Sequence, residues 1–231
     1  MSTSIHTLPL GVANTFIVKE RGTILIDCGA PKKANAFIKL LPATGIKPED
    51  IQLIIITHGH WDHIGSAADI KEITGAKIAM HHREKDRLEK LSQPPLKGVG
   101  AWGSFLAKTM AAVMTPFIHI RSAEVDIVLE DTTFSLNDYG IAGRIVYTPG
   151  HTVGSVSILL DSGEAIVGDM AMNSLPMRLS PGLPIFAENL PQLIESWRKL
   201  LKEGVKSIYP SHGGPFSPDV MRKAVSQCSY S

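Results

Sequence analysis

The chain has little cysteine and no marked excess of charge of either sign. Two cysteines, Cys28 and Cys228, stand near opposite ends of the 231 residues, which excludes a disulfide framework and, without CxxC spacing, a zinc knuckle. A net charge of +1 provides no global field that would attract nucleic acid or an anionic membrane. The composition, with 44% hydrophobic and 19% charged residues, argues against intrinsic disorder. We therefore expect a folded protein without a nucleic-acid or membrane partner.

Long apolar runs and a secretory leader are also missing. The opening residues MSTSIHTLPLGVANT contain no cationic region followed by a long apolar stretch. No segment reaches the roughly 18 uninterrupted apolar residues that a membrane-spanning helix needs. These absences predict a soluble, cytoplasmic protein.

Short β-branched runs alternate with helical patterns along the whole chain. The run at 51–56 has almost no polar interruption, which is typical of an interior strand covered on both faces. The clearest helix carries its apolar stripe over 190–201 and ends near Gly204. Further strands are predicted at 13–18, 23–27, 77–80, 125–129, 132–136, 145–148, 155–160, 165–167 and 207–209. Strands and helices in both halves predict two packed sheets with helices outside, four layers within a single domain, 1–231.

A helical insertion is predicted near 82–118. Its first part, 82–91, is charge-rich and is interpreted as a solvated helix. Its second part places an apolar stripe on one side of a helix over 102–114, which Pro116 would end. Such a stripe belongs to the core, roofs a cleft or forms a contact between two copies of the chain.

Histidine placement is the most informative feature of the sequence. His58, His60 and His63 lie within six residues, with Asp62 among them, directly after the strand at 51–56. In an extended chain, His58 and His60 leave on the same side and can reach one ion, while Asp62 and His63 can turn toward a second ion. Neutral imidazole and carboxylate are ligands that zinc takes in hydrolytic sites.

Three further candidate ligands follow predicted strands. His151 stands in a tight turn within TPGHT, Asp169 follows the strand at 165–167, and His212 follows the strand at 207–209. Together with the first cluster they supply six or seven nitrogen and oxygen donors. That number suits two metal ions that keep open positions for water and substrate.

These motifs, in this order, resemble those of the metallo-β-lactamase superfamily. The resemblance is carried by HxHxDH at 58–63, TPGHTVGS around His151, GD ending at Asp169 and SHGG around His212. The opening LPLGVANTFIV and LIDCG are also similar, so the resemblance runs from about residue 8 to 215. It implies an αββα sandwich with two mixed sheets face to face and metals at one edge of the paired sheets.

The resemblance also implies a role for each motif residue. His58, His60 and His151 would hold one metal, Asp62, His63 and His212 would hold the other, and Asp169 would bridge them. The expected cofactor is two Zn²⁺ per chain, with iron or manganese as alternatives. A shared water whose pKa falls toward about 7 would attack a carbonyl or phosphoryl centre, with Asp62 orienting it or moving its proton. Asp27 either orients a ligand histidine or simply caps a turn.

Departures from the family narrow the expected substrate. Secreted antibiotic-degrading members carry a cysteine or small hydroxyl residue where Asp169 stands here. Glyoxalase II-like thioesterases add a C-terminal helical region, whereas 19 residues follow His212. We expect a zinc hydrolase acting on a small-molecule ester, lactone or thioester with an apolar portion. The alternatives are β-lactam or phosphodiester cleavage, an iron-dependent oxygenase of the persulfide-dioxygenase kind, and a non-enzymatic sensor.

The substrate-binding residues are predicted from apolar side chains near the expected cleft. Trp102 and Phe105 come from the insertion, and Met177 and Phe186 come from the proline-rich loop 173–188. If these residues line a pocket, they favour an acyl or other apolar group over a charged one. The same insertion, at 98–118, is the expected contact of a homodimer.

Overall fold

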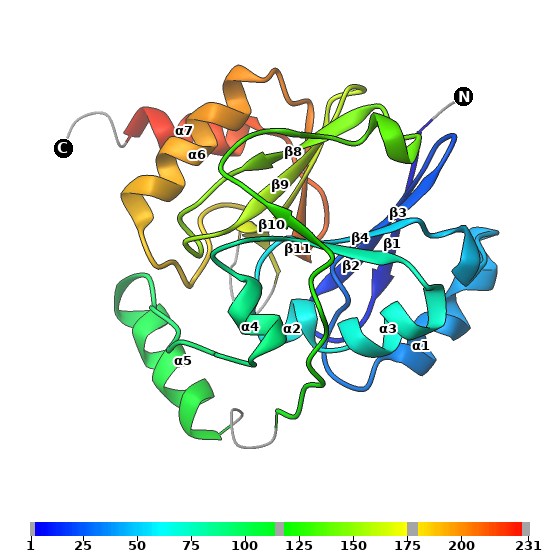
Figure 1. The fold of residues 1–231 in the computed structure, drawn as a ribbon. Helices are drawn as coiled ribbons and strands as arrows, with labels where there is room; N and C mark the ends of the chain where they lie inside the picture. Colours follow the sequence, from blue (N-terminus) through cyan, green and yellow to red (C-terminus); the bar gives the residue numbers. More distant parts are fainter. Residues whose placement is uncertain (1–2, 114–117, 175–179, 228–231) are drawn as a thin grey trace.

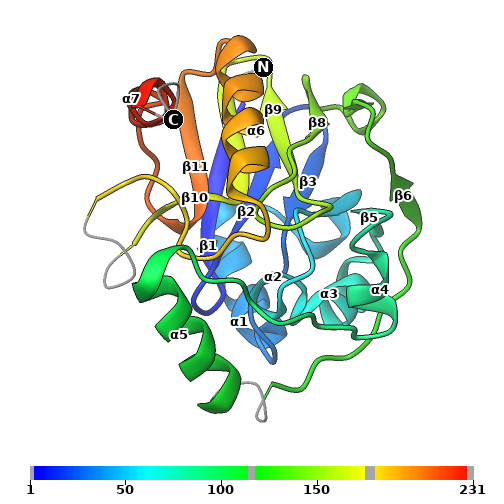
Figure 2. The same cartoon turned by 90° about the vertical axis from the view of Figure 1, so that its left-hand side faces the viewer.

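Two β-sheets lie face to face, and helices cover their outer faces (Figures 1 and 2). The computed structural model describes residues 3–113, 118–174 and 180–227. In that part of the chain, the first sheet has the order β1 (Ser4–Pro9), β2 (Asn14–Lys19), β3 (Thr23–Ile26), β4 (Leu53–Ile56), β5 (Lys77–His81) and β6 (Ile127–Leu129). The second has the order β11 (Ser207–Gly213), β10 (Glu164–Asn173), β9 (Val156–Leu160), β8 (Gly143–Tyr147) and β7 (Phe134–Ser135). Both sheets mix parallel and antiparallel pairs, so the predicted αββα sandwich is confirmed.

The helices divide between the two outer faces and one end of the molecule. Those described are α1 (Ala34–Leu40), α2 (Trp61–Ile64), α3 (Ala67–Thr74), α4 (Lys85–Glu89), α5 (Gly100–Val113), α6 (Leu190–Lys202) and α7 (Asp219–Gln227), with short 3-10 turns at Leu41–Thr44, Pro48–Asp50 and Asn137–Tyr139. Helices α1 and α3 lie against the first sheet, and α6 and α7 lie against the second (Figure 1). None of the described helices has the length and apolar character needed to cross a membrane.

Alternate residues of the central strands enter different layers of the core. Ile24 and Ile26 of β3 pack between the two sheets, whereas Leu25 packs against the helices. In β4, Leu53 and Ile55 likewise face the second sheet while the residues between and after them face the helices. Because side chains alternate across a strand, a strand buried on both faces has to be apolar throughout. This explains the unbroken β-branched run that the sequence shows.

The segment after the His58–His60 loop forms two short helices, α2 and α3. Gly65 separates them, and a Cβ on this glycine would lie 2.3 Å from the backbone nitrogen of Pro31. The Gly65 N–H donates to the carbonyl of Gly29, and the Ser66 hydroxyl donates to the carbonyl of Ala30. The close approach of the loop after β3 therefore fixes the chain between the two helices.

The prediction that 82–91 is a solvated helix is wrong for its central residues. Helix α4 is short, and Glu84 and Arg87 are only 0% and 6% exposed. Asp86 and Lys90 do lie at the surface, where they form an exposed ion pair. A charge run gives no signal for this division, because burial of Glu84 and Arg87 depends on partners far away in the sequence.

Helix α5 stands at one end of the molecule and does not cover the outer face of either sheet (Figure 2). It turns Ala107 inward, toward a small apolar cluster with Ile185 and Phe186. Trp102 and Phe105 are more than half exposed and stack on each other at 5.8 Å between ring centroids. The apolar stripe expected on one side is thus divided between an inner and an outer face. Met114 and Pro116, expected near the end of this helix, lie outside the described residues.

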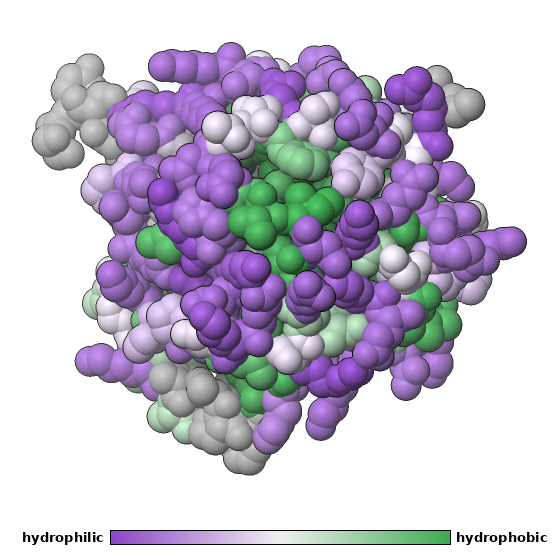
Figure 3. Space-filling view, in the orientation of Figure 1, coloured by the Kyte–Doolittle hydropathy of each residue, from purple (hydrophilic) through white to green (hydrophobic). Residues whose placement is uncertain are grey.

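The apolar layer between the sheets reaches the surface near the middle of the face seen in Figure 1. Figure 3 shows hydrophilic residues over most of this face and apolar residues gathered near its centre, where β6 passes in front of the second sheet. Val128 of β6 is 43% exposed, and Ile127 and Phe134 are partly buried against the layer between the sheets.

Candidate metal centre

Seven imidazole and carboxylate side chains meet where strands of both sheets end. They come from the loop after β4 (His58, His60), from α2 (Asp62, His63), from the turn between β8 and β9 (His151), from β10 (Asp169) and from β11 (His212). Each of them is at most 8% exposed. The structure therefore brings together every residue that the sequence proposed as a metal ligand.

Asp169 reaches the centre because β10 is irregular next to it. The pairing of β10 with β11 shifts register at Gly168, and this glycine has a φ of 54°. A Cβ at Gly168 would lie 2.7 Å from the Thr57 hydroxyl oxygen. Only glycine combines this left-handed backbone with so close an approach. The bulge turns the Asp169 carboxylate toward the histidines from both halves of the chain.

The first ligand group consists of His58, His60, His151 and Asp169. His58 Nε2, His60 Nδ1 and His151 Nε2 lie 3.0 to 3.1 Å from one another. Asp169 Oδ2 lies 3.7 Å from His151 Nε2 and 4.0 Å from His58 Nε2. Nitrogens that share one tetrahedral zinc ion are about 3.4 Å apart, which is close to this arrangement.

The second ligand group consists of Asp62, His63 and His212. Asp62 Oδ2 is 3.3 Å from His212 Nε2, and Asp62 Oδ1 is 3.9 Å from His63 Nε2. Asp169 touches this group as well, with Oδ2 3.2 Å from His212 Nε2 and Oδ1 3.4 Å from His63 Nε2. Its carboxylate thus lies between the two groups, where a bridging ligand would stand.

Backbone carbonyls fix the orientation of two of the histidines. His151 Nδ1 donates to the carbonyl of Phe186 at 2.8 Å, and His212 Nδ1 donates to the carbonyl of Val12 at 3.0 Å. Because a carbonyl only accepts, each ring carries its proton on Nδ1 and, when neutral, presents the Nε2 lone pair to the centre. Both histidines are therefore set to bind a metal through Nε2.

Asp27 supports the centre from the end of β3. Its Oδ2 accepts a hydrogen bond from His63 Nδ1 at 2.8 Å, and its Oδ1 accepts one from the Thr57 N–H at 2.8 Å. Asp27 is fully buried and has a φ of 62°, which is unusual for a residue other than glycine. These contacts hold the His63 ring and the start of the His58 loop to one carboxylate.

The histidines of the two groups differ in their affinity for protons. Burial lowers the pKa of His58 and of His60 well below the ordinary value, and neighbouring imidazoles lower both further. Burial also lowers the pKa of His151. These rings are therefore neutral at pH 7, the form that binds metal.

In the second group, carboxylates override the effect of burial. Burial alone would lower the pKa of His212, but Asp169 and Asp62 raise it to about 10. For His63, burial alone would likewise lower the pKa, but Asp27, Asp169 and Asp62 raise it well above its ordinary value. Without a metal, both rings therefore hold a second proton, on Nε2, that a metal ion would displace.

The donor set fits divalent metal ions. His63 Nε2 and Asp169 Oδ1 are buried and have no hydrogen-bond partner among the described residues. Buried polar atoms without partners are costly, and a cation between them would satisfy both. Nitrogen and carboxylate donors without a thiolate suit zinc, iron and manganese. The residues present therefore match the chemistry of a two-ion site.

The sequence profile of the metallo-beta-lactamase superfamily matches residues 8–212, which include all seven candidate ligands. The chain belongs to this superfamily. The "Probable metallo-hydrolase YflN" of Bacillus subtilis is 28% identical over 173 residues, covering 73% of this chain and 64% of that protein. The "Probable metallo-hydrolase MJ0888" of Methanocaldococcus jannaschii is 29% identical over 87% of each chain.

The fold comparison agrees with the sequence comparison. The crystal structure of ST1585, an archaeal metallo-beta-lactamase superfamily protein from Sulfolobus tokodaii, matches 100% of this chain and 88% of its own with a TM-score of 0.66 at 21% identity. The predicted membership of the metallo-β-lactamase superfamily is thus confirmed.

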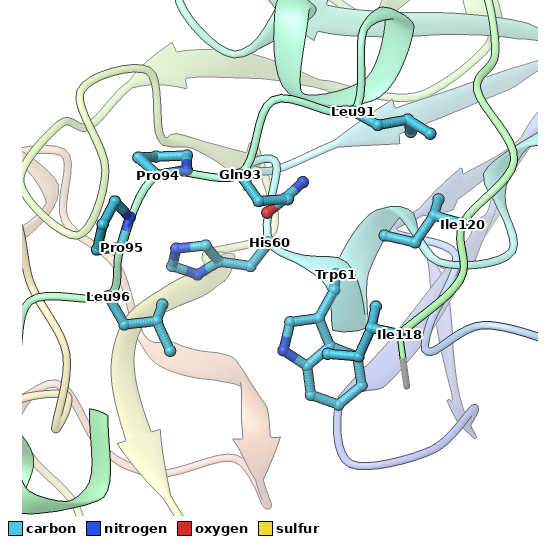
Figure 4. Close-up of a pocket in the computed structure, with 9 residues that line it drawn as sticks. All are labelled: His60, Trp61, Leu91, Gln93, Pro94, Pro95, Leu96, Ile118 and Ile120. Atoms are coloured by element: carbon cyan, nitrogen blue, oxygen red, sulfur yellow. The ribbon is translucent and has the colours of Figure 1, made fainter. Parts of the chain in front are cut away.

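Two cavities of this superfamily member adjoin the metal centre. The inner one, about 200 Å³, reaches Asp62, Asp169 and His212 and is otherwise lined mainly by apolar side chains: Val12, Trp61, Leu96, Met110, Met172 and Phe186, with His60. The outer one, about 430 Å³, shares His60, Trp61 and Leu96 with it. Figure 4 shows the outer cavity between the 91–96 segment and Ile118 and Ile120, with Trp61 below.

The residues predicted to bind substrate fall in different places. Phe186 lines the inner cavity. Trp102 and Phe105 line neither cavity, because α5 directs Met110 toward the centre and leaves these two aromatic rings on its outer face. Met177 lies outside the described residues. Their role in binding stays a prediction.

Sequence reasoning missed several residues around the centre. Leu96 and Met172 line the inner cavity. Ser211, which belongs to β11, lies near Asp27. Glu84 and Arg87 are buried beside the His58 loop. None of these carries a local pattern that separates it from an ordinary core or surface residue. The charge run around Glu84 is the only pattern in the sequence that marks this region, and such a run predicts a solvent-exposed segment.

Proposed function

We propose that this protein is a dinuclear zinc hydrolase that cleaves an ester, lactone or thioester with an apolar portion. The observation that carries the proposal is the joint presence of two complete ligand groups and an apolar cavity that opens on both. Mononuclear sites do not need Asp62, His63 and His212, which are buried here: His63 and His212 face Asp169, and Asp62 faces His212.

Asp62 is the proposed catalytic residue. When bound, two zinc ions would supply Lewis acidity that lowers the pKa of a water toward about 7 and polarises the substrate oxygen. Asp62 lines the inner cavity, and burial, which raises its pKa, is outweighed by His63 and His212, which lower it. Its carboxylate is therefore ionised and able to orient the attacking water and accept its proton.

The cavity lining supports a neutral, apolar substrate. Among the described residues, neither cavity is lined by a lysine or arginine that would pair with a phosphate or carboxylate. Leu96, Met110 and Phe186 instead offer an apolar wall beside the ligands. A substrate whose scissile carbonyl meets the ligand groups would place its acyl portion against this wall. This favours the ester-type substrates over phosphodiesters.

An iron-dependent oxygenase would use the first ligand group alone. His58, His60, His151 and Asp169 are the residues that the two proposals share. Metal content separates them, because the proposed hydrolase would hold two zinc ions and the oxygenase would hold one iron.

The test is a metal-defined substrate screen. Purified protein is stripped with a chelator, reloaded with zinc, iron or manganese, and assayed on lactones, thioesters, aryl esters, β-lactams and phosphodiesters. We expect two zinc ions per chain and turnover of ester-type substrates that increases with acyl length. The Asp62→Asn variant, assayed at the same metal content, controls for contaminating hydrolases. Two bound zinc ions without turnover of any ester-type substrate would contradict the proposal and favour a sensor.

A further inference from the structure

A charged cluster, buried except for its partly exposed Glu188, lies beside the first ligand group and contains none of the seven candidate ligands. It consists of Glu84, Arg87 and Glu188. Arg87 lies between the two carboxylates. Its Nε is 3.1 Å from Glu84 Oε2, and its Nη2 is 2.7 Å from Glu188 Oε1. Burying charges costs free energy, and a buried ion pair adds little net stability compared with apolar packing. The backbone groups that this cluster holds are therefore the informative contacts.

The cluster binds the two loops that carry the histidines of the first group. Glu84 Oε2 accepts from the N–H of Gly59, the residue between His58 and His60, at 2.9 Å. Glu84 Oε1 accepts from the N–H of Gly154 in the His151 turn at 3.1 Å. One buried carboxylate thus joins a loop of the first sheet to a loop of the second.

Glu188 strengthens the hold on the His151 turn. Its Oε2 accepts from the N–H of Val153 at 2.9 Å, and its own N–H donates to the carbonyl of His151 at 3.0 Å. Arg87 ties this carboxylate to Glu84, so the two carboxylates that hold Val153 and Gly154 form one connected set of charges.

The side-chain stems of the cluster also pack tightly against both loops. A Cβ at Gly59 would lie 2.5 Å from Cβ and Cδ of Arg87, and a Cβ at Gly154 would lie 2.6 Å from Cγ of Glu84. Both loops therefore approach the cluster as closely as only glycine allows. Small displacements of either loop would be resisted by packing as well as by hydrogen bonds.

The second ligand group is supported by other residues. His63 is held by Asp27 and His212 by the carbonyl of Val12. We propose that Glu84 and Arg87 are positioning residues that set the distance between the His58–His60 loop and the His151 turn, and so determine metal affinity at the first group alone. This inference rests on the proposed two-metal function.

The experiment measures zinc affinity by chelator competition at one group at a time. The His212→Ala background isolates the first group, and the His151→Ala background isolates the second. The double change Glu84→Gln with Arg87→Met is introduced into both backgrounds. It keeps the shapes of the two side chains similar, and it does not leave the charge of Arg87 without the Glu84 carboxylate. An amide nitrogen cannot accept from an N–H, so the glutamine loses one of the two backbone contacts. Asp86→Asn, in the exposed ion pair of α4, is the matched control.

We expect zinc affinity at the first group to fall about 10- to 100-fold and affinity at the second group to change less than about threefold. The control should change neither. Equal losses in both backgrounds, or a lower melting temperature with unchanged affinity in the folded protein, would overturn the inference and leave only a structural role. If neither background binds zinc before Glu84 and Arg87 are changed, the proposed function is overturned, and with it this inference.

Discussion

The two ligand groups lie side by side and share Asp169, yet they differ in charge. In the first group, three imidazole nitrogens face one another, and burial lowers the pKa of each ring. In the second group, His63 and His212 face carboxylates that raise the pKa of both rings. The first group therefore offers neutral donors, while the second exchanges protons for metal.

This difference shows that the same residue type becomes a different ligand in a different environment. A histidine among histidines is deprotonated by burial, and it binds a metal without losing a proton. A histidine among carboxylates is a strong base, so its affinity for a metal depends on pH. Changes confined to one ligand group test this difference between the histidines.

The largest effect is expected from removing a ligand of the first group. His58→Ala should abolish hydrolysis of ester-type substrates and lower the bound metal in parallel, because three remaining donors lose their shared geometry. Activity and metal content are measured on the same preparation. His212→Ala should retain one metal per chain. Wild-type turnover by His58→Ala protein would disprove the assignment of the first group.

A strong effect of pH is expected at the second group alone. Below the raised pKa of about 10 at His212, zinc binding there should strengthen by about tenfold per pH unit for each displaced proton. Without metal, the stability of the folded protein depends on pH in the opposite direction. The raised pKa of His212 stabilises the folded protein fully below pH 6.5, and this stability is lost as pH rises through about 10.

The measurement is a zinc titration at several pH values in the two single-group backgrounds. Affinity at the first group should change little above neutral pH, because its rings are already neutral. The same pH slope at both groups would show that the predicted difference in protonation is absent.

A smaller effect is expected from Asp27→Asn. The asparagine can donate to His63 Nδ1, which favours the tautomer with a proton on Nε2, the atom that faces the second group. Zinc affinity at the second group should fall about 10- to 100-fold. Asp27 also accepts from Thr57, so a thermal melt is recorded beside the titration. Unchanged affinity at the second group would reduce Asp27 to a structural contact.

The smallest effect concerns the cavity wall. Leu96 borders both cavities, so Leu96→Ala should raise KM for long-acyl substrates by about tenfold and for short ones by less. Trp102→Ala is the matched control, since this ring is 56% exposed and borders neither cavity. A larger effect of Trp102→Ala than of Leu96→Ala would restore the original prediction that the outer face of α5 binds substrate.

The sequence predicted the fold and the candidate ligands because both have local signatures. The HxHxDH block follows a buried strand, whereas His151, Asp169 and His212 were assigned through the resemblance of their motifs to those of the superfamily. In the structure His151 follows β8, His212 lies near the end of β11 and Asp169 lies within β10. The interior position of β4 was visible in its unbroken apolar run. Continuous burial on two faces leaves that trace in any sequence.

Asp27 was predicted as a possible support of a ligand histidine, but Glu84 and Arg87 could not be predicted, because their environment is made by distant segments. Glu84 stands in a charge run whose average favours solvent, and only Gly59 and Gly154, brought from two other loops, explain its burial. Trp102 fits an apolar stripe, but the orientation of α5 decides which side faces the centre. Periodicity identifies a face of a helix and does not say what the face meets.

The chemistry of the centre follows directly from the residues, since the number and kind of donors are written in the sequence. How those donors differ depends on the folded structure. Proton affinity depends on burial and on the charges nearby, and these are set by the packing of the two sheets and their loops. For this reason chemically identical histidines become neutral ligands around His151 and proton-binding ligands beside Asp62.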